Sequence, residues 1–130
     1  MGGPAAPVGV GVDLVDVGSF AKRFEGRDDL LAAVFSESEL VYARAQHDPW
    51  AHLAARFAAK EAALKALGTG LTGAMTWRDI EVTRDAAGKP GLEFSGAFAA
   101  ALAREGAVDG SVSLAHTDQH AVAVVLLRPA

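Results

Sequence analysis

The chain has 130 residues, 51% of them hydrophobic, which fits one compact domain with a real core and leaves little room for two. Its formal net charge of −4 gives no electrostatic support for a nucleic-acid partner, and no apolar run approaches the roughly 20 residues of a membrane-spanning helix. The sequence contains no cysteine, which excludes disulfides, zinc thiolates and thiol catalysis and is consistent with a cytoplasmic protein.

The first half of the chain predicts one strand followed by helices. Residues 1–7 lack the basic and apolar segments of a signal peptide, and we interpret them as a flexible tail before a single domain over residues 8–130. Residues 8–17 are β-branched and predict the opening strand. Apolar spacing, a capping box at Ser36 and Glu39, and the Asp48-Pro49 start signal predict helices near 20–24, 30–35, 36–45 and 48–67.

The second half predicts mainly strands. Residues 80–83 and 92–94 read as a hairpin, residues 95–105 as a helix, and residues 112–114 and 121–127 as two further strands. We therefore expect an α+β domain of order β-α-α-α-β-β-α-β-β, with an antiparallel sheet packed on a long central helix. The last strand is apolar on both faces, which favours packing between subunits.

The long helix carries charges inside its apolar stripe. At 100° per residue from Arg56, Lys60 falls at about 40°, within the apolar arc, and Glu61 at about 140°, on its edge. Lys65 follows one turn later. Glu61 and Lys65 could form an ordinary i,i+4 pair on a solvated border. Alternatively, Glu61 is a metal ligand beside two ammonium groups, as a pyrophosphate site requires, and spacing alone does not decide between these.

The first strand contains two acidic residues. Asp13 and Asp16 interrupt its apolar pattern, and either carboxylate could cap the next turn or serve as an oxygen ligand for a hard cation. Mg²⁺ is typically held by one or two carboxylates, with water and substrate phosphates in the other positions. Asp13 together with Glu61 would meet that count.

These residues resemble the holo-acyl-carrier-protein synthases, the small phosphopantetheinyl transferases. Five blocks occur in that family's order and spacing: GVGVDLV at 9–15, RFAAKEA with KALGTG over 56–70, WRDIEV at 77–82, GKP at 88–90 and SLAHT at 113–117. The resemblance implies transfer of the phosphopantetheine arm of coenzyme A to a serine of apo acyl carrier protein, in fatty acid or polyketide biosynthesis. It also implies a homotrimer with coenzyme A in clefts between neighbouring subunits.

The resemblance also implies roles for individual residues. Asp13 and Glu61 would bind the Mg²⁺ that bridges the pyrophosphate, and Lys65 would offset charge on the leaving phosphate. The further residues expected to contact coenzyme A are Arg56, Lys60, Gly68, Thr69, Gly70, His116 and Thr117. Many relatives have a histidine where Ser111 stands, so a phosphate contact from that position must be weaker or come from elsewhere.

Two roles are hypotheses at this stage. Glu61, acting through a water, or a metal-bound water would take the serine proton, with His116 as the alternative base. Lys22, Arg23 and Arg27 would dock the acidic carrier protein, although they could equally form an ordinary solvated face.

The other histidines suggest no site. We expect His47, His52 and His120 on the surface, and none has the spacing of a transition-metal site. Two alternative functions stay open: a Mg²⁺-dependent phosphodiester hydrolase, and a binding module that holds coenzyme A without turnover.

Overall fold

The computed structural model describes residues 8–130, and the predicted tail, residues 1–7, lies outside the described part. The elements are β1 (Gly9–Asp16), α1 (Val17–Phe24), α2 (Asp28–Val34), α3 (Glu37–Arg44), α4 (Pro49–Leu67), a 3₁₀ turn η1 (Trp77–Asp79), β2 (Ile80–Arg84), β3 (Pro90–Phe94), α5 (Gly96–Arg104), β4 (Ala107–His116) and β5 (His120–Pro129). The predicted α+β class and single domain are observed. Gly26 lies between α1 and α2. Four helices therefore separate β1 from β2 within the described residues, where the predicted order has three.

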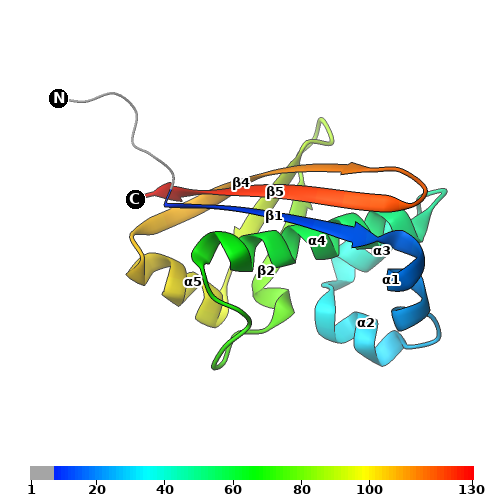
Figure 1. The fold of residues 1–130 in the computed structure, drawn as a ribbon, viewed down its shortest axis with the longest axis horizontal. Helices are drawn as coiled ribbons and strands as arrows, with labels where there is room; N and C mark the ends of the chain where they lie inside the picture. Colours follow the sequence, from blue (N-terminus) through cyan, green and yellow to red (C-terminus); the bar gives the residue numbers. More distant parts are fainter. Residues whose placement is uncertain (1–7) are drawn as a thin grey trace.

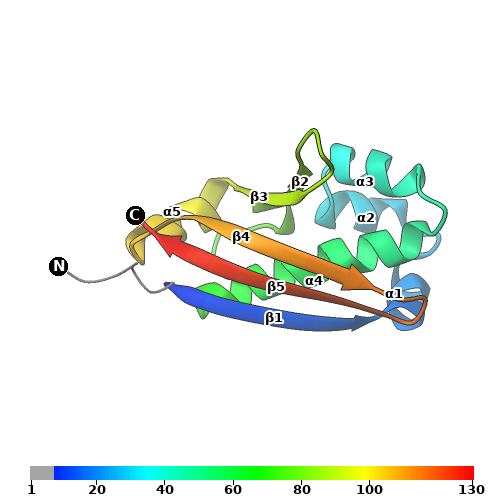
Figure 2. The ribbon, with the colours of Figure 1, turned by 90° about the horizontal axis from the view of Figure 1, so that it is seen from above.

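Two antiparallel sheets form the β layer. Strands β1, β5 and β4 make a three-stranded sheet in that order, and β2 pairs with β3 in the predicted hairpin. The helices lie on one side of the larger sheet, with α4 running beneath its strands (Figures 1 and 2). No helix within residues 8–130 is long and apolar enough to cross a membrane.

Local signals determine where the helices begin and end. The Asp48 carboxylate accepts a hydrogen bond from Ala51 N (3.4 Å), and Pro49 occupies the first turn of α4. Gly68 ends α4 in the left-handed conformation, at φ 87°, which costs glycine little. Ser36 and Glu39 form the predicted capping box of α3. These predictions are confirmed.

The central helix lies unusually close to the first strand. Gly9 and Gly11 face α4, and a Cβ atom on either would overlap the carbonyl oxygens of Ala66 and Ala62. The facing helix positions are alanines, which are fully or almost fully buried. Because side chains alternate along a strand, Asp13 points to the same face as the two glycines. The close approach therefore brings the Asp13 carboxylate to α4.

The two faces of the larger sheet differ in cover. On the inner face, Ala121, Ala123, Val125 and Leu127 of β5 are buried against the helices. The outer face is apolar but uncovered in the single chain: its exposed residues are Val10, Val12, Leu14, Val124 and Leu126, between 39% and 66% exposed. Helix α4 thus supplies only half of the cover that the apolar last strand requires.

Candidate functional site

Asp13, Glu61 and Lys65 come together where β1 meets α4. Lys65 Nζ donates to Asp13 Oδ1 at 2.7 Å and to the Val12 carbonyl oxygen at 3.4 Å. The hydrogen bond to Asp13 raises the pKa of the Lys65 ammonium group. The Lys65 side chain remains 53% exposed, so it can still turn toward a ligand. The expected cluster is therefore present, with Lys65 paired to Asp13 rather than forming a simple surface pair with Glu61.

The two carboxylates of the cluster, Asp13 and Glu61, are not fully neutralised by the positive charges around them. Burial raises the pKa of the Glu61 carboxyl group, the charge of Asp13 raises it further, and Lys65 and Arg23 only partly oppose this shift. A cation between the two carboxylates would relieve that repulsion. Within residues 8–130 no three His, Cys, Asp or Glu residues gather around one point, so two carboxylates are the ligand set available here. Two hard oxygen ligands with open positions suit Mg²⁺ beside a phosphate.

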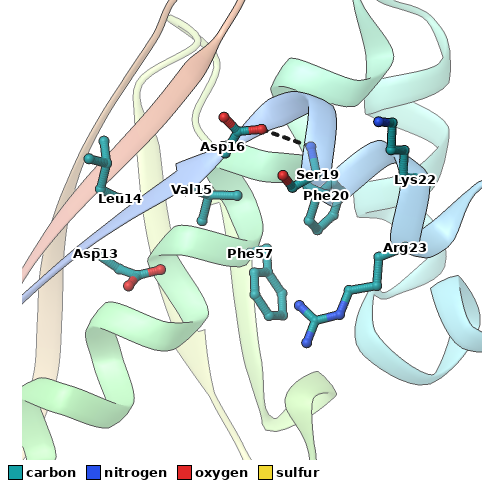
Figure 3. A pocket seen from close by; sticks show the side chains of 9 residues that line it. All are labelled: Asp13, Leu14, Val15, Asp16, Ser19, Phe20, Lys22, Arg23 and Phe57. Atoms are coloured by element: carbon teal, nitrogen blue, oxygen red, sulfur yellow. Dashed lines mark hydrogen bonds between the residues drawn. The ribbon is translucent and has the colours of Figure 1, made fainter.

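A cleft of about 590 Å³ extends from Asp13 along helix α1. Figure 3 shows its lining, with β1 on one side, Ser19 to Arg23 of α1 on the other, and Phe57 of α4 between them. The Arg23 guanidinium reaches toward Phe57, whereas the Lys22 side chain points away from it. Asp16 accepts a hydrogen bond from Ser19 N at 2.8 Å and caps α1, so the capping interpretation holds for Asp16.

A second, basic pocket of about 200 Å³ opens on another side of α4. Its lining residues come from five segments of the chain: Tyr42, His52, Ala55, Arg56, Arg84, Gly88, Pro90, Leu114 and His116. None of them is acidic. Arg56 and Arg84 each place their guanidinium carbon over the Tyr42 ring, 4.3 and 4.2 Å from its centroid. The predicted coenzyme A residues Arg56 and His116 thus lie in one pocket.

Arg56 is buried in this pocket with one of its hydrogen-bond donors unsatisfied. It is 3% exposed, its Nη1 donates to the His52 carbonyl oxygen at 3.3 Å, and its buried Nε has no partner. Burial lowers the pKa of the Arg56 guanidinium, and the charge of Glu39 opposes this shift. A buried cation with an unpaired donor calls for an anionic partner.

Lys60 lies in neither group. It is fully buried, and its Nζ donates to Glu39 Oε1 at 2.9 Å, to the Trp77 carbonyl oxygen at 3.2 Å and to the Ile80 carbonyl oxygen. All three ammonium protons are therefore used inside the core. The position of Lys60 within the apolar arc is as predicted, but the geometry does not support the expected contact with coenzyme A.

The remaining predicted residues lie at the surface. Gly68, Thr69 and Gly70 follow the end of α4 and are exposed. The Thr117 hydroxyl accepts from the backbone N–H groups of residues 119 and 120, so it shapes the turn between β4 and β5. Ser111 accepts from Arg128 Nη1 at 2.8 Å. The Arg128 guanidinium therefore lies beside the position where relatives often have histidine. Its Nε also pairs with Asp109 Oδ1 at 2.6 Å.

Among the polar side chains that line this pocket, those of Tyr42, Arg84 and His52 were not predicted from the sequence. His52 was expected on the surface, but it is half-buried and its ring lies 4.8 Å from that of His116. Its spacing of four residues from Arg56 was the available signal, because i and i+4 share one face of a helix. Tyr42 and Arg84 carry no such signal, since only the packing of α3 and β2 brings them here.

Comparison with known proteins shows the family to which this chain belongs. The family profile of the 4′-phosphopantetheinyl transferase superfamily matches residues 9–125. The holo-[acyl-carrier-protein] synthase of Moorella thermoacetica is 44% identical over 119 residues, covering 91% of each chain. The crystal structure of holo-[acyl-carrier-protein] synthase from Neisseria meningitidis superposes with a TM-score of 0.83 at 30% identity, covering 94% of this chain and 98% of that one. The ACPS–CoA complex of Chronobacterium ammoniagenes gives 0.82 at 33% identity, with coverages of 94% and 97%. The chain therefore belongs to the 4′-phosphopantetheinyl transferase superfamily and, within it, to the holo-acyl-carrier-protein synthases.

Proposed function

We propose that this protein transfers phosphopantetheine from coenzyme A to a serine of apo acyl carrier protein, releasing adenosine 3′,5′-bisphosphate, with Mg²⁺ as cofactor. The observation that carries the proposal is the group of Asp13, Glu61 and Lys65, in which two carboxylates share one ammonium group and Asp13 also lines an open cleft. The named activity of the relatives and the coenzyme A complex of one of them support the substrate assignment.

The donor set of the cluster fits Mg²⁺. Asp13 and Glu61 would hold the ion, and water and phosphate oxygens would complete its coordination. When bound, Mg²⁺ polarises phosphoryl oxygens and offsets their charge. Lys65 would then turn from Asp13 toward the leaving phosphate, which its exposure allows.

The transfer itself requires little covalent chemistry from the protein. The serine oxygen forms a bond to the β-phosphorus of coenzyme A, the bond from that phosphorus to the bridging oxygen breaks, and the electron pair leaves with adenosine 3′,5′-bisphosphate. The serine proton must pass to a base. Glu61, acting through a water, is our choice, because its carboxylate lies in the cluster where the pyrophosphate would bind. His116 lies instead in the basic pocket.

A homotrimer with sites between subunits accounts for two features of the single chain. The carboxylate cluster and the basic pocket are separate on one protomer, although both have the chemistry to bind parts of coenzyme A. The uncovered apolar face of β1 and β5 is the surface through which copies would associate. In that assembly, the cluster of one subunit would face the basic pocket of its neighbour.

The acidic carrier protein would dock on α1 and the start of α2. Lys22 and Arg23 are exposed in the last turn of α1, beside the cleft. Arg27 precedes α2, and its pair with Asp29, at 3.7 Å, leaves both side chains more than half exposed. An exposed ion pair of this kind is weak, so the Arg27 guanidinium can still interact with a partner protein.

The cytoplasmic location stays a prediction.

Mass spectrometry of apo acyl carrier protein incubated with this protein, coenzyme A and Mg²⁺ tests the proposal. We expect the carrier protein to gain the mass of one phosphopantetheine, and we expect this gain to be far slower with Glu61→Gln. Release of free phosphopantetheine without any carrier protein would indicate a hydrolase instead. Binding of coenzyme A without either product would indicate a binding module.

A further inference from the structure

Two histidine rings face each other at the wall of the basic pocket. His52 of α4 and His116 of β4 have ring centroids 4.8 Å apart in an edge-to-face arrangement, with an interplanar angle of 67°. The His52 ring also packs edge-to-face against Tyr42, with ring centroids 5.7 Å apart. His52 therefore contacts two aromatic rings, and this packing restricts its orientation.

The charges around His52 are mainly positive. Arg56, one turn along α4, and Arg84 of β2 line the same pocket, together with the neutral Tyr42 of α3. Among the described residues, the negative charge of Asp48 opposes them; Asp48 lies at the start of α4, and its carboxylate also caps the helix. Gly88, in the loop after β2, and Pro90, at the start of β3, also line the pocket, and neither can titrate.

This environment disfavours a proton on His52. Burial lowers the pKa of His52, the neighbouring His116 and Arg56 lower it further, and Asp48 opposes the shift. A phosphate group entering the pocket would bring the negative charge that is missing. Its attraction to an imidazolium would favour a proton on one of the two rings, because a nearby opposite charge stabilises the charged form of a titratable group.

We propose that His52 and His116 act as one proton-accepting pair, so that binding of a phosphate group beside Arg56 is coupled to uptake of a proton from solvent by one of the two rings. His52 would thus be a further phosphate-binding residue of this chain, and it would tune affinity for the nucleotide to pH. By linkage, proton and phosphate each raise the affinity for the other by the same factor. The inference rests on the proposed coenzyme A site.

Calorimetric titration with adenosine 3′,5′-bisphosphate tests the pair without requiring turnover. Titrations near pH 7 in two buffers of different ionisation enthalpy give the number of protons taken up. For the wild-type protein, we expect a net uptake and an affinity that rises about threefold to tenfold between about pH 7.5 and about pH 6. His52→Phe preserves the aromatic packing but cannot titrate, so its proton uptake should fall and its pH dependence should flatten.

The matched control is His47→Phe, which removes an exposed histidine just before α4 and should behave like the wild type. Titration of the phosphate itself contributes equally to all variants and cancels in the comparison. NMR titration of the wild-type imidazoles, with and without the nucleotide, gives a second reading that needs no variant, and there the pKa of one ring of the pair should rise on binding.

Equal proton uptake and equal pH dependence in wild type and His52→Phe, with unshifted wild-type imidazoles, would overturn the inference while leaving the proposed function intact. Absence of nucleotide binding, together with absence of transfer to the carrier protein, would overturn both.

Discussion

Two lysines of helix α4 form ion pairs with carboxylates of other elements, and the two pairs differ in burial and in how many of their hydrogen bonds are made. Lys60 and Glu39 are both 0% exposed, and each is saturated: Lys60 donates to two carbonyl oxygens besides Glu39, while Glu39 accepts from the backbone N–H groups of Ser36 and Val82. Lys65 and Asp13 are partly open, and Glu61 beside them lacks a full countercharge. The saturated Lys60–Glu39 pair links α3, α4 and β2. The Lys65–Asp13 pair still has donors and acceptors that could bind a ligand.

The unsaturated group should control activity. We expect Glu61→Gln to lower the rate of phosphopantetheine transfer about 10²–10⁴-fold, because the substitution removes both a carboxylate ligand and the proposed base. Steady-state transfer to apo acyl carrier protein measures this effect. Glu37→Gln, which changes an exposed carboxylate of α3, is the control and should retain the wild-type rate. Comparable rates in the two variants would contradict the assignment.

The saturated pair should control stability. We expect Lys60→Met to lower the free energy of unfolding by about 3–5 kcal/mol, because Glu39 would be left as a buried charge without its partner. Lys65→Met is the matched variant on the same helix and should change stability by less than about 1 kcal/mol, since its pair is partly exposed. Denaturant unfolding measures both. If the two variants lost equal stability, the distinction between the two pairs would fail.

The basic residues of α1 and the start of α2 belong to neither pair and should affect only binding of the carrier protein. We expect Lys22→Glu combined with Arg27→Glu to raise the KM for the acidic carrier protein about threefold to tenfold and to leave the KM for coenzyme A unchanged. Arg23 is kept in this variant because its charge reaches Glu61. Arg44→Glu, on α3, serves as the control. Equal changes in both KM values would argue against docking at α1.

The smallest expected effect concerns pH and stability. Because the pKa of folded Glu61 lies above its ordinary value of 4.5, the folded state binds more protons there than the unfolded state. The stability contributed by this group is therefore present at acid pH and is lost as pH rises through the raised pKa. At neutral pH, Glu61→Gln should be more stable than the wild type by a few tenths to about 1 kcal/mol, a range reduced for solvent screening.

Unfolding of both proteins at neutral pH and near pH 4 measures this difference, which should shrink at the lower pH. A variant that is less stable than the wild type at neutral pH would show that Glu61 contributes to the fold as Glu39 does.

Part of the site could be predicted because it depends on local pattern. Asp13 follows two glycines at strand spacing, and Glu61 and Lys65 lie one turn apart on a helix whose ends are marked by Asp48-Pro49 and Gly68. Spacing could not separate the two lysines by role. Lys60 was placed correctly in the apolar arc, but the partner that neutralises it, Glu39, lies 21 residues away.

The sequence by itself determined the capped ends of α3 and α4, the single α+β domain and the family, because caps, periodicity and ordered motifs act over a few residues. It did not determine every boundary: β4, predicted over residues 112–114, spans Ala107–His116, and Val17 begins α1 rather than ending β1. Only the tertiary structure decided which charges are satisfied. Saturation of a charge depends on atoms brought together from distant segments: Trp77 and Ile80 around Lys60, and Tyr42, Arg84 and His116 around Arg56. Burial then makes an unpaired group costly enough to require a ligand.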